Sequence, residues 1–222
     1  MIRMIIVVVA PLLLGAISGS TSDSSASSRE IENSTTSSLL GSTSKSTAHK
    51  ISSKRVVALR YYAKANGFST RYGLFSDLGR FSGDRRFYII DFQAHAIVHA
   101  GLVTHGHCKE DKKEVRFSNT PGSNCSSAGK YSVGESYIGN FGLAFKLHGL
   151  DASNSNAFKR FIVMHAHECV YDGVRSHEIC ESEGCPTVSK GTLNKIQALV
   201  RGETKPLLLW VYKDDGANSQ TS

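Results

Sequence analysis

The pattern of apolar and polar positions divides the chain into three parts. Residues 4–17 are apolar apart from small and turn residues, and Ser and Thr dominate the stretch that follows, up to residue 53. From residue 54 onward, short apolar segments alternate with polar turns. We therefore predict one folded domain at 54–214, preceded by a flexible linker at 21–53 and followed by a flexible tail at 215–222.

The domain is predicted to be mainly β, with a mixed sheet or sandwich and a few short helices, because many short strand patterns are separated by turns. Apolar spacing favours a helix at 54–66, with Gly67 as its C-terminal stop, and a shorter helix at 193–200. Residues 72–78 are predicted to be a short helical or loop element, and 106–130 a polar loop. Predicted strands, rich in apolar, β-branched and aromatic residues, are 86–91, 96–103, 131–138, 143–147, 160–167 and 206–212.

The first 20 residues are typical of an export signal. Arg3 is the only charge before an apolar run of 14 residues, which is short for a bilayer span, and small residues follow at 18–20. The alternative is an uncleaved anchor, which would attach the protein to a membrane. Both interpretations place the folded domain outside the cytoplasm, in the periplasm or cell envelope.

The charge balance is mildly basic. The formal net charge is +7, and removing residues 1–20 deletes one charge, Arg3, to leave +6. A basic exported domain suits an anionic envelope polymer, although a basic surface also serves solubility. No basic run is interleaved with aromatic residues, so nucleic acid is not expected as a partner.

Five cysteines in an oxidising compartment leave one thiol over. We expect disulfides Cys169–Cys180 and Cys108–Cys125, with Cys185 free. The spacing does not fix this pairing, and five free thiols in a reducing compartment is the alternative.

The segment 182–186, Ser-Glu-Gly-Cys-Pro, is the candidate site for nucleophilic chemistry. A Cys directly after a Gly presents its thiol beside unencumbered backbone, and the N–H groups of Gly184 and Cys185 are candidate oxyanion donors. Ser182 is expected to orient this loop or to bind substrate; capping the turn is the alternative. Cys185 also has a structural interpretation, as a buried or disulfide-bonded residue.

His165 and His167 lie upstream on one predicted strand, where a period of two places them on one face. Either is a candidate general base for Cys185, and a hydrogen-bonded core histidine is the alternative. A second functional hypothesis is zinc, with both histidines as ligands and Cys or another His as the third. No HExxH motif or paired CxxC supports it, so neither a metal nor another cofactor is expected. The further histidines available as ligands are His105, His107, His148 and His177.

Four blocks of sequence resemble the murein L,D-transpeptidases, over about residues 55–212. The blocks are 87–106 (FYIIDFQAHAIVHAGLVTHG), 117–135 (FSNTPGSNCSSAGKYSVGE), 156–167 (NAFKRFIVMHAH) and 182–189 (SEGCPTVS). The resemblance is to a divergent branch with Gly-Cys-Pro at the nucleophile. Glu183 stands where the family has His, Thr187 where it has an Arg expected to help hold a substrate carboxylate, and Ala166 where it has Gly.

The resemblance implies a mostly β catalytic domain with Cys185 as nucleophile, His165 as base and backbone oxyanion donors. It implies peptidoglycan stem peptides as substrates and 3→3 cross-links as products, formed through a Cys thioester. Three alternatives stay open at this point: an L,D-carboxypeptidase, a zinc-dependent wall peptidase and a non-catalytic envelope-binding domain. The oligomeric state is not indicated.

Overall fold

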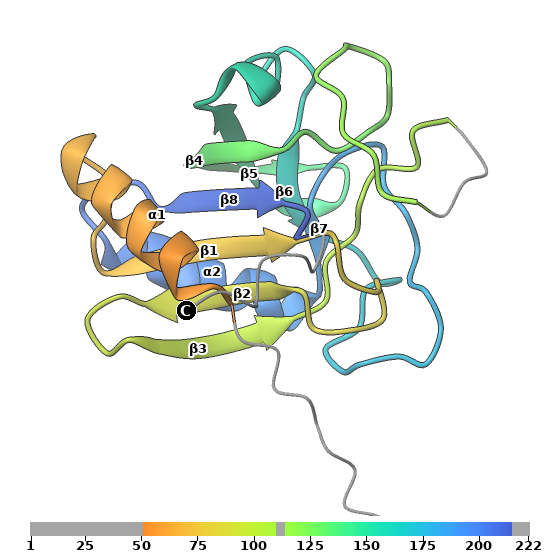
Figure 1. The fold of residues 1–222 in the computed structure, drawn as a ribbon. Helices are drawn as coiled ribbons and strands as arrows, with labels where there is room; N and C mark the ends of the chain where they lie inside the picture. The colour runs from red at the N-terminus through yellow and green to blue at the C-terminus, as the bar shows by residue number, and fades with distance from the viewer. Residues whose placement is uncertain (1–50, 110–113, 215–222) are drawn as a thin grey trace, which may run out of the picture. The chain divides into compact units, whose positions relative to one another are not determined.

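The computed structural model describes residues 51–109 and 114–214 (Figure 1). The predicted export signal or anchor at 1–20, all but the end of the linker at 21–53, and the tail at 215–222 lie outside the described residues. Within the described part of the chain, no helix combines the length and apolar character that crossing a membrane requires.

The described residues form one eight-stranded mixed sheet with two α-helices, which confirms the predicted mainly-β class. The strand order is β3-β2-β1-β8-β4-β5-β6-β7. The strands are β1 (Tyr72–Asp77), β2 (Phe87–Asp91), β3 (Ala96–Gly101), β4 (Gly129–Gly139), β5 (Gly142–Gly149), β6 (Val163–Ala166), β7 (Thr187–Val188) and β8 (Leu208–Tyr212). The helices are α1 (Ser53–Ala65), α2 (Lys190–Gly202) and the short 3₁₀ helix η1 (Ala152–Asn154).

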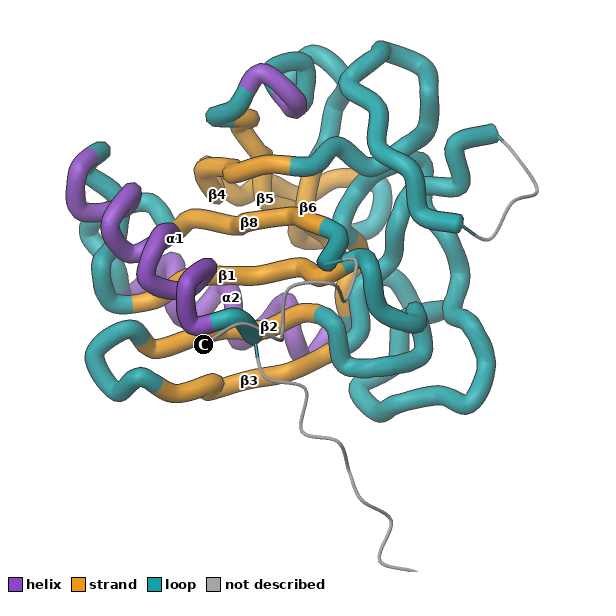
Figure 2. The backbone as a smooth tube through the Cα atoms, in the orientation of Figure 1, coloured by secondary structure: helices purple, strands orange, loops and turns teal. Residues whose placement is uncertain are grey.

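The two helices cover opposite faces of the sheet, and Figure 2 shows most of the irregular chain gathered beyond one end of the strands. Leu193 and Ile196 of α2 belong to the core on one face, with Leu74, Ile89 and Leu209. On the other face, Leu59 and Ala63 of α1 pack with Phe75, Ile90 and Leu208. Adjacent strand residues therefore enter different cores, and the central strands need apolar side chains at nearly every position.

This burial on both faces explains the one element that was predicted wrongly. Residues 72–77 form strand β1, which pairs antiparallel with β2 and parallel with β8. The segment has no polar-apolar alternation, and Gly73 and Ser76 lower its intrinsic strand preference. Gly73 is needed because the Phe92 ring occupies the space of a side chain there. Hydrogen bonds from strands on both sides outweigh the weak local preference.

Other element boundaries differ from the prediction by a few residues. The strand expected at 160–167 is confined to β6, because the chain turns immediately before it and Phe161 has a φ of 56°. Helix α2 is longer than expected and begins after Ser189, whose Oγ accepts the Thr192 N–H. The two-residue strand β7 was not predicted, since two residues carry no periodic signal.

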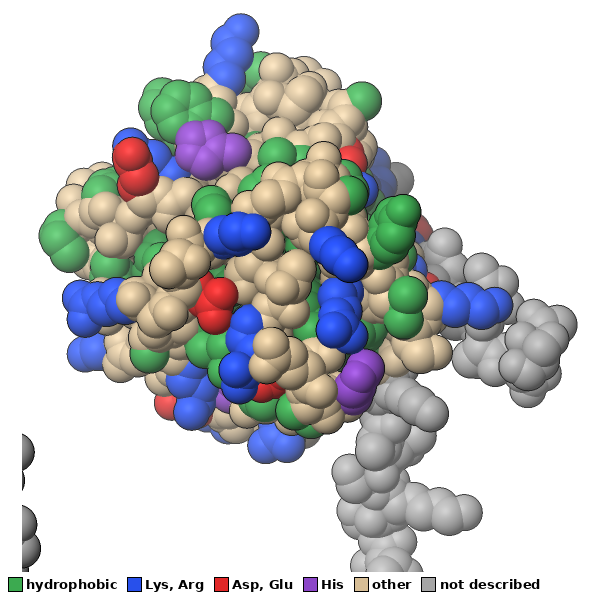
Figure 3. All heavy atoms as spheres, turned by 90° about the vertical axis from the view of Figure 1, so that its left-hand side faces the viewer, with side chains coloured by type: hydrophobic (Ala, Val, Ile, Leu, Met, Phe, Trp, Pro, Cys, Tyr) green, Lys and Arg blue, Asp and Glu red, His purple; other side chains and the backbone are tan. Residues whose placement is uncertain are grey.

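Basic side chains are spread over one face of the molecule. On the face shown in Figure 3, Lys and Arg side chains are more frequent than Asp and Glu, and polar groups separate them. Such a distribution gives a diffuse positive potential over this face.

Arg86 and His105 form a buried polar pair beside β2. The Arg86 side chain is 1% exposed; its Nε donates to Val103 O and its Nη2 donates to His105 Nδ1, both over 2.9 Å. Burial lowers the pKa of Arg86 to about 10. Burial, and then the charge of Arg86, lower the pKa of His105 to about 4, so His105 is neutral at pH 7.

Truncating the centre of the sheet is expected to be costly. Leu209 is fully buried in β8, so Leu209→Ala should lower the free energy of unfolding by about 2–5 kcal/mol, through lost burial and an unfilled cavity. Ile138→Ala, at a side chain that is 78% exposed, should change it by less than about 0.5 kcal/mol. Urea unfolding of both variants checks this, and equal effects would contradict the assigned core.

The Arg86–His105 pair predicts acid sensitivity. Between pH 6.5 and about 4 the unfolded chain protonates His105 while the folded chain does not, so stability falls as pH falls. His105→Gln keeps an acceptor for Arg86 but does not titrate, and it should remove about 1–3 kcal/mol of this loss. Urea unfolding of both proteins at pH 7.5 and pH 4.5 measures the difference. Parallel losses in the two would show that His105 does not contribute.

Candidate active site

Cys185 lies just before β7, with its sulfur against the start of β6. The Val163 N–H donates to Cys185 Sγ over 3.5 Å, and the Sγ–H donates to Phe161 O over 3.8 Å. Cys185 is half-buried and is the free cysteine among those described. The thiol therefore lies against the strand that carries His165.

The loop that presents Cys185 is fixed by side-chain hydroxyls. Ser182 Oγ accepts the Gly184 N–H over 3.2 Å and lies 2.7 Å from Cys185 O, to which it donates. Thr104 Oγ1 also donates to Cys185 O, over 3.1 Å. The Ser182 N–H donates to His105 O over 2.8 Å. Ser182 thus caps this turn and orients the loop, so the structure combines two of the three roles considered for it.

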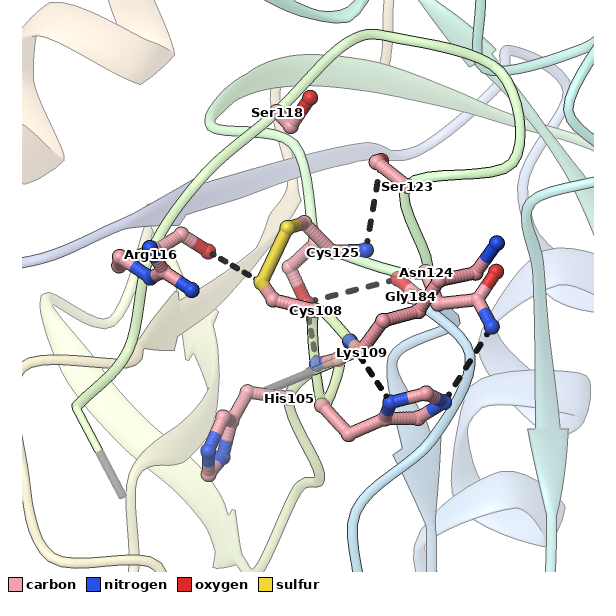
Figure 4. Close-up of a disulfide and its surroundings, with 12 residues drawn as sticks. His105, Cys108, Lys109, Arg116, Ser118, Ser123, Asn124, Cys125 and Gly184 are labelled. Atoms are coloured by element: carbon pink, nitrogen blue, oxygen red, sulfur yellow. Dashed lines mark hydrogen bonds between the residues drawn. A yellow bond between two sulfur atoms is a disulfide. The ribbon is translucent and has the colours of Figure 1, made fainter. Parts of the chain in front are cut away.

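Gly184 is required by the way this loop packs. Its φ is +109°, and a Cβ at this position would lie 2.5 Å from Cys125 O. Figure 4 shows Gly184 beside Asn124 and the Cys108–Cys125 disulfide. Because the Gly184 N–H already donates to Ser182 Oγ, it is not available as an oxyanion donor in this arrangement. Of the two donors expected from the sequence, the Cys185 N–H is the better candidate.

Two disulfides flank the site. Cys108–Cys125 joins two parts of the 106–130 loop, and Cys169–Cys180 closes the segment between β6 and the Cys185 loop. These are the two pairs considered from the sequence, and Cys185 is left as the thiol.

His165 is a buried residue of β6 whose ring stacks on Phe141, with centroids 4.8 Å apart. Its Nδ1 lies 3.1 Å from Ala166 O, a pure acceptor, so Nδ1 carries the hydrogen of the neutral ring. Nε2 is then an acceptor and lies 3.2 Å from Thr187 Oγ1. Burial lowers the pKa of His165 most strongly, and the charge interaction with His167 lowers it further. The hydrogen bond to the Ala166 carbonyl raises the pKa and opposes both effects. A neutral imidazole can accept a proton.

The strand register places His165 and Cys185 close to one another in the fold. β6 and β7 are parallel, with His165 opposite Thr187, two residues after Cys185. Val163 lies two residues before His165 on β6, and its N–H donates a hydrogen bond to Cys185 Sγ. The hydrogen bonds of the described residues include none between the His165 ring and Cys185 Sγ. The structure therefore places Cys185, in the loop before β7, against the strand that carries His165, without a direct hydrogen bond between the two side chains.

His167 shares the Phe141 contact, with ring centroids 5.6 Å apart in an edge arrangement. Its Nδ1 accepts the Cys169 N–H over 3.2 Å and lies 2.9 Å from Cys169 Sγ. Phe141 thus contacts both histidine rings. The prediction that one strand carries both histidines is not met, because β6 ends at Ala166 and His167 follows it. The ring contacts place His167 beside the Cys169–Cys180 disulfide.

The donor geometry gives little support to zinc. Among the described residues, three side chains lie close enough together to share a metal ion: His167, Cys169 and Cys180. Their potential ligand atoms lie within 4.8 Å of one another. Both sulfurs are in a disulfide and do not offer thiolates. His165 is not part of this group, so the pair proposed as ligands in the zinc hypothesis does not converge on a third.

The surroundings of Cys185 have opposing effects on its acidity. Burial raises the pKa of the thiol most strongly, and the nearby Glu183 carboxylate also raises it. The Val163 N–H and the Arg160 guanidinium lower it. In this arrangement the net shift is upward, which favours the protonated thiol at neutral pH.

Arg160 is a site residue that the sequence analysis did not identify. Its Nη1 donates to Ser118 O over 2.8 Å and to Ser127 Oγ over 2.6 Å, and its Nη2 donates to Cys125 O over 2.6 Å. Arg160 therefore holds the 117–127 loop and brings a positive charge near Cys185. Its partners lie 33–42 residues away in sequence, so one arginine in a basic chain gave no signal of this role.

Comparison with solved structures gives remote similarities. They include the helical cell shape determining protein Pgp2 (K307A mutant) from Campylobacter jejuni, with 15% identity, 64% of this chain and 47% of that chain covered, and a TM-score of 0.43. An L,D-transpeptidase from Xylanimonas cellulosilytica has 13% identity, 68% of each chain covered and a TM-score of 0.37. This chain therefore spans about half the length of Pgp2.

No curated protein matches this chain. Residues 43–212, more than half of the sequence, match a family described as the L,D-transpeptidase catalytic domain. This match covers every strand and helix described above. The chain belongs to the L,D-transpeptidase catalytic domain family.

Proposed function

We propose that this protein is an exported cysteine acyltransferase, an L,D-transpeptidase of a Gly-Cys-Pro branch, which acts on peptidoglycan stem peptides in the cell envelope. The observation that carries the proposal is a free cysteine, Cys185, held by a hydroxyl-bonded Gly loop that leads into β7, the strand paired with His165. A family of such catalytic domains supports the substrate class. The apolar sequence at 1–20, which is typical of an export signal, supports the location.

His165 is proposed as the general base. The His165 ring is neutral and offers Nε2 as its acceptor, which Thr187 Oγ1 contacts in the resting structure. Substrate binding would turn the sulfur from Val163 N–H and Phe161 O toward this ring. Catalytic hydrogen bonds are often long or misaligned before substrate binds, so the resting geometry is compatible with this role.

The proposed reaction has two halves. The Cys185 thiolate attacks the carbonyl of the L-centre residue preceding a terminal D-amino acid, and an S–C bond forms. The C–N bond then breaks, the proton held by His165 passes to the leaving amine, and a thioester remains. An amine of a neighbouring stem attacks this thioester to form a 3→3 cross-link, and Cys185 leaves as the thiol.

Charge stabilisation is assigned to two groups. The Cys185 N–H is the proposed oxyanion donor; loss of one such donor typically costs about a hundredfold to a thousandfold in rate. Arg160 is a positioning residue, since it holds the opposing loop and its charge favours the Cys185 thiolate. In this proposal, Cys185 and Arg160 stabilise the charges that develop during acyl transfer.

Water in place of the amine would make the protein an L,D-carboxypeptidase with the same thioester. A non-catalytic envelope-binding domain is the remaining alternative. It predicts no acylation of Cys185, which the next experiment measures.

The purified protein should gain the mass of one drug molecule after incubation with a carbapenem, whose strained amide acylates a reactive thiolate. The four other cysteines are in disulfides, so one adduct is the expected stoichiometry. Intact mass spectrometry of wild type and Cys185→Ala measures it, with circular dichroism as a check of folding. An adduct on Cys185→Ala, or none on folded wild type, would refute the assigned nucleophile. Incubation with a stem tetrapeptide then separates cross-linked product from hydrolysed tripeptide.

Arg160→Gln should shift the reactivity of Cys185 to higher pH, because the guanidinium lowers the pKa of this thiol. Alkylation by iodoacetamide at pH 7 should slow by about threefold to tenfold, with the midpoint of the pH–rate profile raised. Lys159→Gln, at the exposed neighbouring residue, is the matched control and should not change the profile.

Arg160→Lys keeps the charge and should restore part of the shift. A slower rate with an unmoved midpoint in Arg160→Gln would assign Arg160 a purely structural role in the 117–127 loop.

A further inference from the structure

A cavity of about 260 Å³ lies beside the buried Arg86–His105 pair. The residues that decide its charge are Arg80, Arg86, His105, Glu114, Glu178 and Lys213. Neither Cys185 nor His165 lines it. The cavity is therefore distinct from the site of the proposed acyl transfer.

Arg86 enters this cavity as a buried cation without a matched anion. Its three donor nitrogens each bond a neutral acceptor: Nε donates to Val103 O, Nη1 to Arg80 O and Nη2 to His105 Nδ1. A guanidinium has five N–H groups, so two remain. No carboxylate of the described residues lies within ion-pair distance of Arg86. A buried charge left in this state is costly unless something compensates it.

Two other donors beside the cavity are also unmet. Because Arg86 donates to His105 Nδ1, the neutral ring of His105 carries its hydrogen on Nε2. His105 Nε2 and Arg80 Nε are buried and have no hydrogen-bond partner. Glu181 Oε1 lies 3.3 Å from His105 Nε2 but is not aligned to accept its hydrogen. All of these unmet groups are donors, so the missing partner is an acceptor.

Among the residues that line the cavity, basic side chains outnumber acidic ones. Glu114 pairs with Lys213, with Nζ and Oε1 3.1 Å apart. With His105 neutral, the lining residues Arg80, Arg86 and Lys213 outnumber Glu114 and Glu178 by one positive charge. Asp77 and Glu178 act on Arg86 only at longer range, where they oppose the lowering of its pKa by burial.

We propose that this cavity binds a small carboxylate, with Arg86, Arg80 and His105 as its hydrogen-bond donors. A planar guanidinium fork matches a carboxylate in geometry and charge. The volume is below that of typical drug-sized pockets, which suits an anion with a short attached group. The proposal goes beyond the acyl-transfer function and does not depend on it.

The cavity also has a structural connection to the nucleophile loop. The carbonyl of His105 accepts the Ser182 N–H over 2.8 Å, and Ser182 Oγ holds both Gly184 and Cys185. His105 thus lines the cavity and also supports the Cys185 loop through its backbone carbonyl. A carboxylate bound to the ring would lie behind that loop.

The test titrates the purified full-length protein with sodium acetate at pH 7, with chloride exchanged to keep ionic strength constant. The ring ¹⁵N signals of His105 report binding at this site alone. We expect a saturable shift of these signals, which Arg80→Met should weaken at least tenfold, because a hydrogen bond to a charged group is lost. Arg85→Met removes one exposed arginine from the same loop and should leave the affinity within twofold.

Arg80→Met is chosen over a substitution of Arg86 because Arg80 is half-buried and Arg86 is fully buried. Replacing Arg80 is therefore less apt to prevent folding. No saturable shift in wild type would overturn the proposal. Equal weakening by Arg80→Met and Arg85→Met would overturn it too, since only general charge would then matter. A parallel titration with inorganic phosphate separates the anion classes, and a response to phosphate alone would overturn the carboxylate assignment.

Discussion

The candidate site depends on the close contact between Gly184 and the backbone carbonyl of Cys125. There is no room for a side chain between them, and the φ of Gly184 suits glycine alone among the common residues. The same carbonyl accepts a hydrogen bond from Arg160, over 2.6 Å. The nucleophile loop, the disulfide-bonded 106–130 loop and the chain entering β6 therefore meet at one oxygen atom. A displacement of any of the three would move Cys185 relative to β6.

The resting state of Cys185 results from a balance between burial and charge. Burial protects a thiol but disfavours the thiolate that acyl transfer requires, while Arg160 and the Val163 N–H favour it. His165 is likewise buried and neutral beside Phe141, so it is able to receive a proton. The loop before β7 thus holds a protonated thiol, and β6 holds an unprotonated base. Substrate would complete the geometry that allows the proton to pass between them.

The mainly-β class and most strands could be predicted from the sequence, because segments rich in β-branched and aromatic residues do form strands of the sheet. It missed β1, where burial on both faces removes alternation and Gly73 makes room for Phe92. At the site, the Gly-Cys pair and the two histidines were recognisable from residue type and spacing. Arg160 and the use of the Gly184 N–H by Ser182 were not, because both depend on loops that meet only in the folded chain. Local patterns cannot show such contacts.

The position of β8 constrains the order in which the domain can assemble. β8 comes last among the described strands but lies between β1 and β4 at the centre of the sheet. Until residues 208–212 are available, the β3-β2-β1 unit and the β4-β5-β6-β7 unit have no strand to join them. A chain emerging from the ribosome, or through a translocation channel, thus lacks its complete sheet until almost the whole domain has passed. Such late, long-range pairing leaves the two halves of the sheet unjoined until the last described strand is in place.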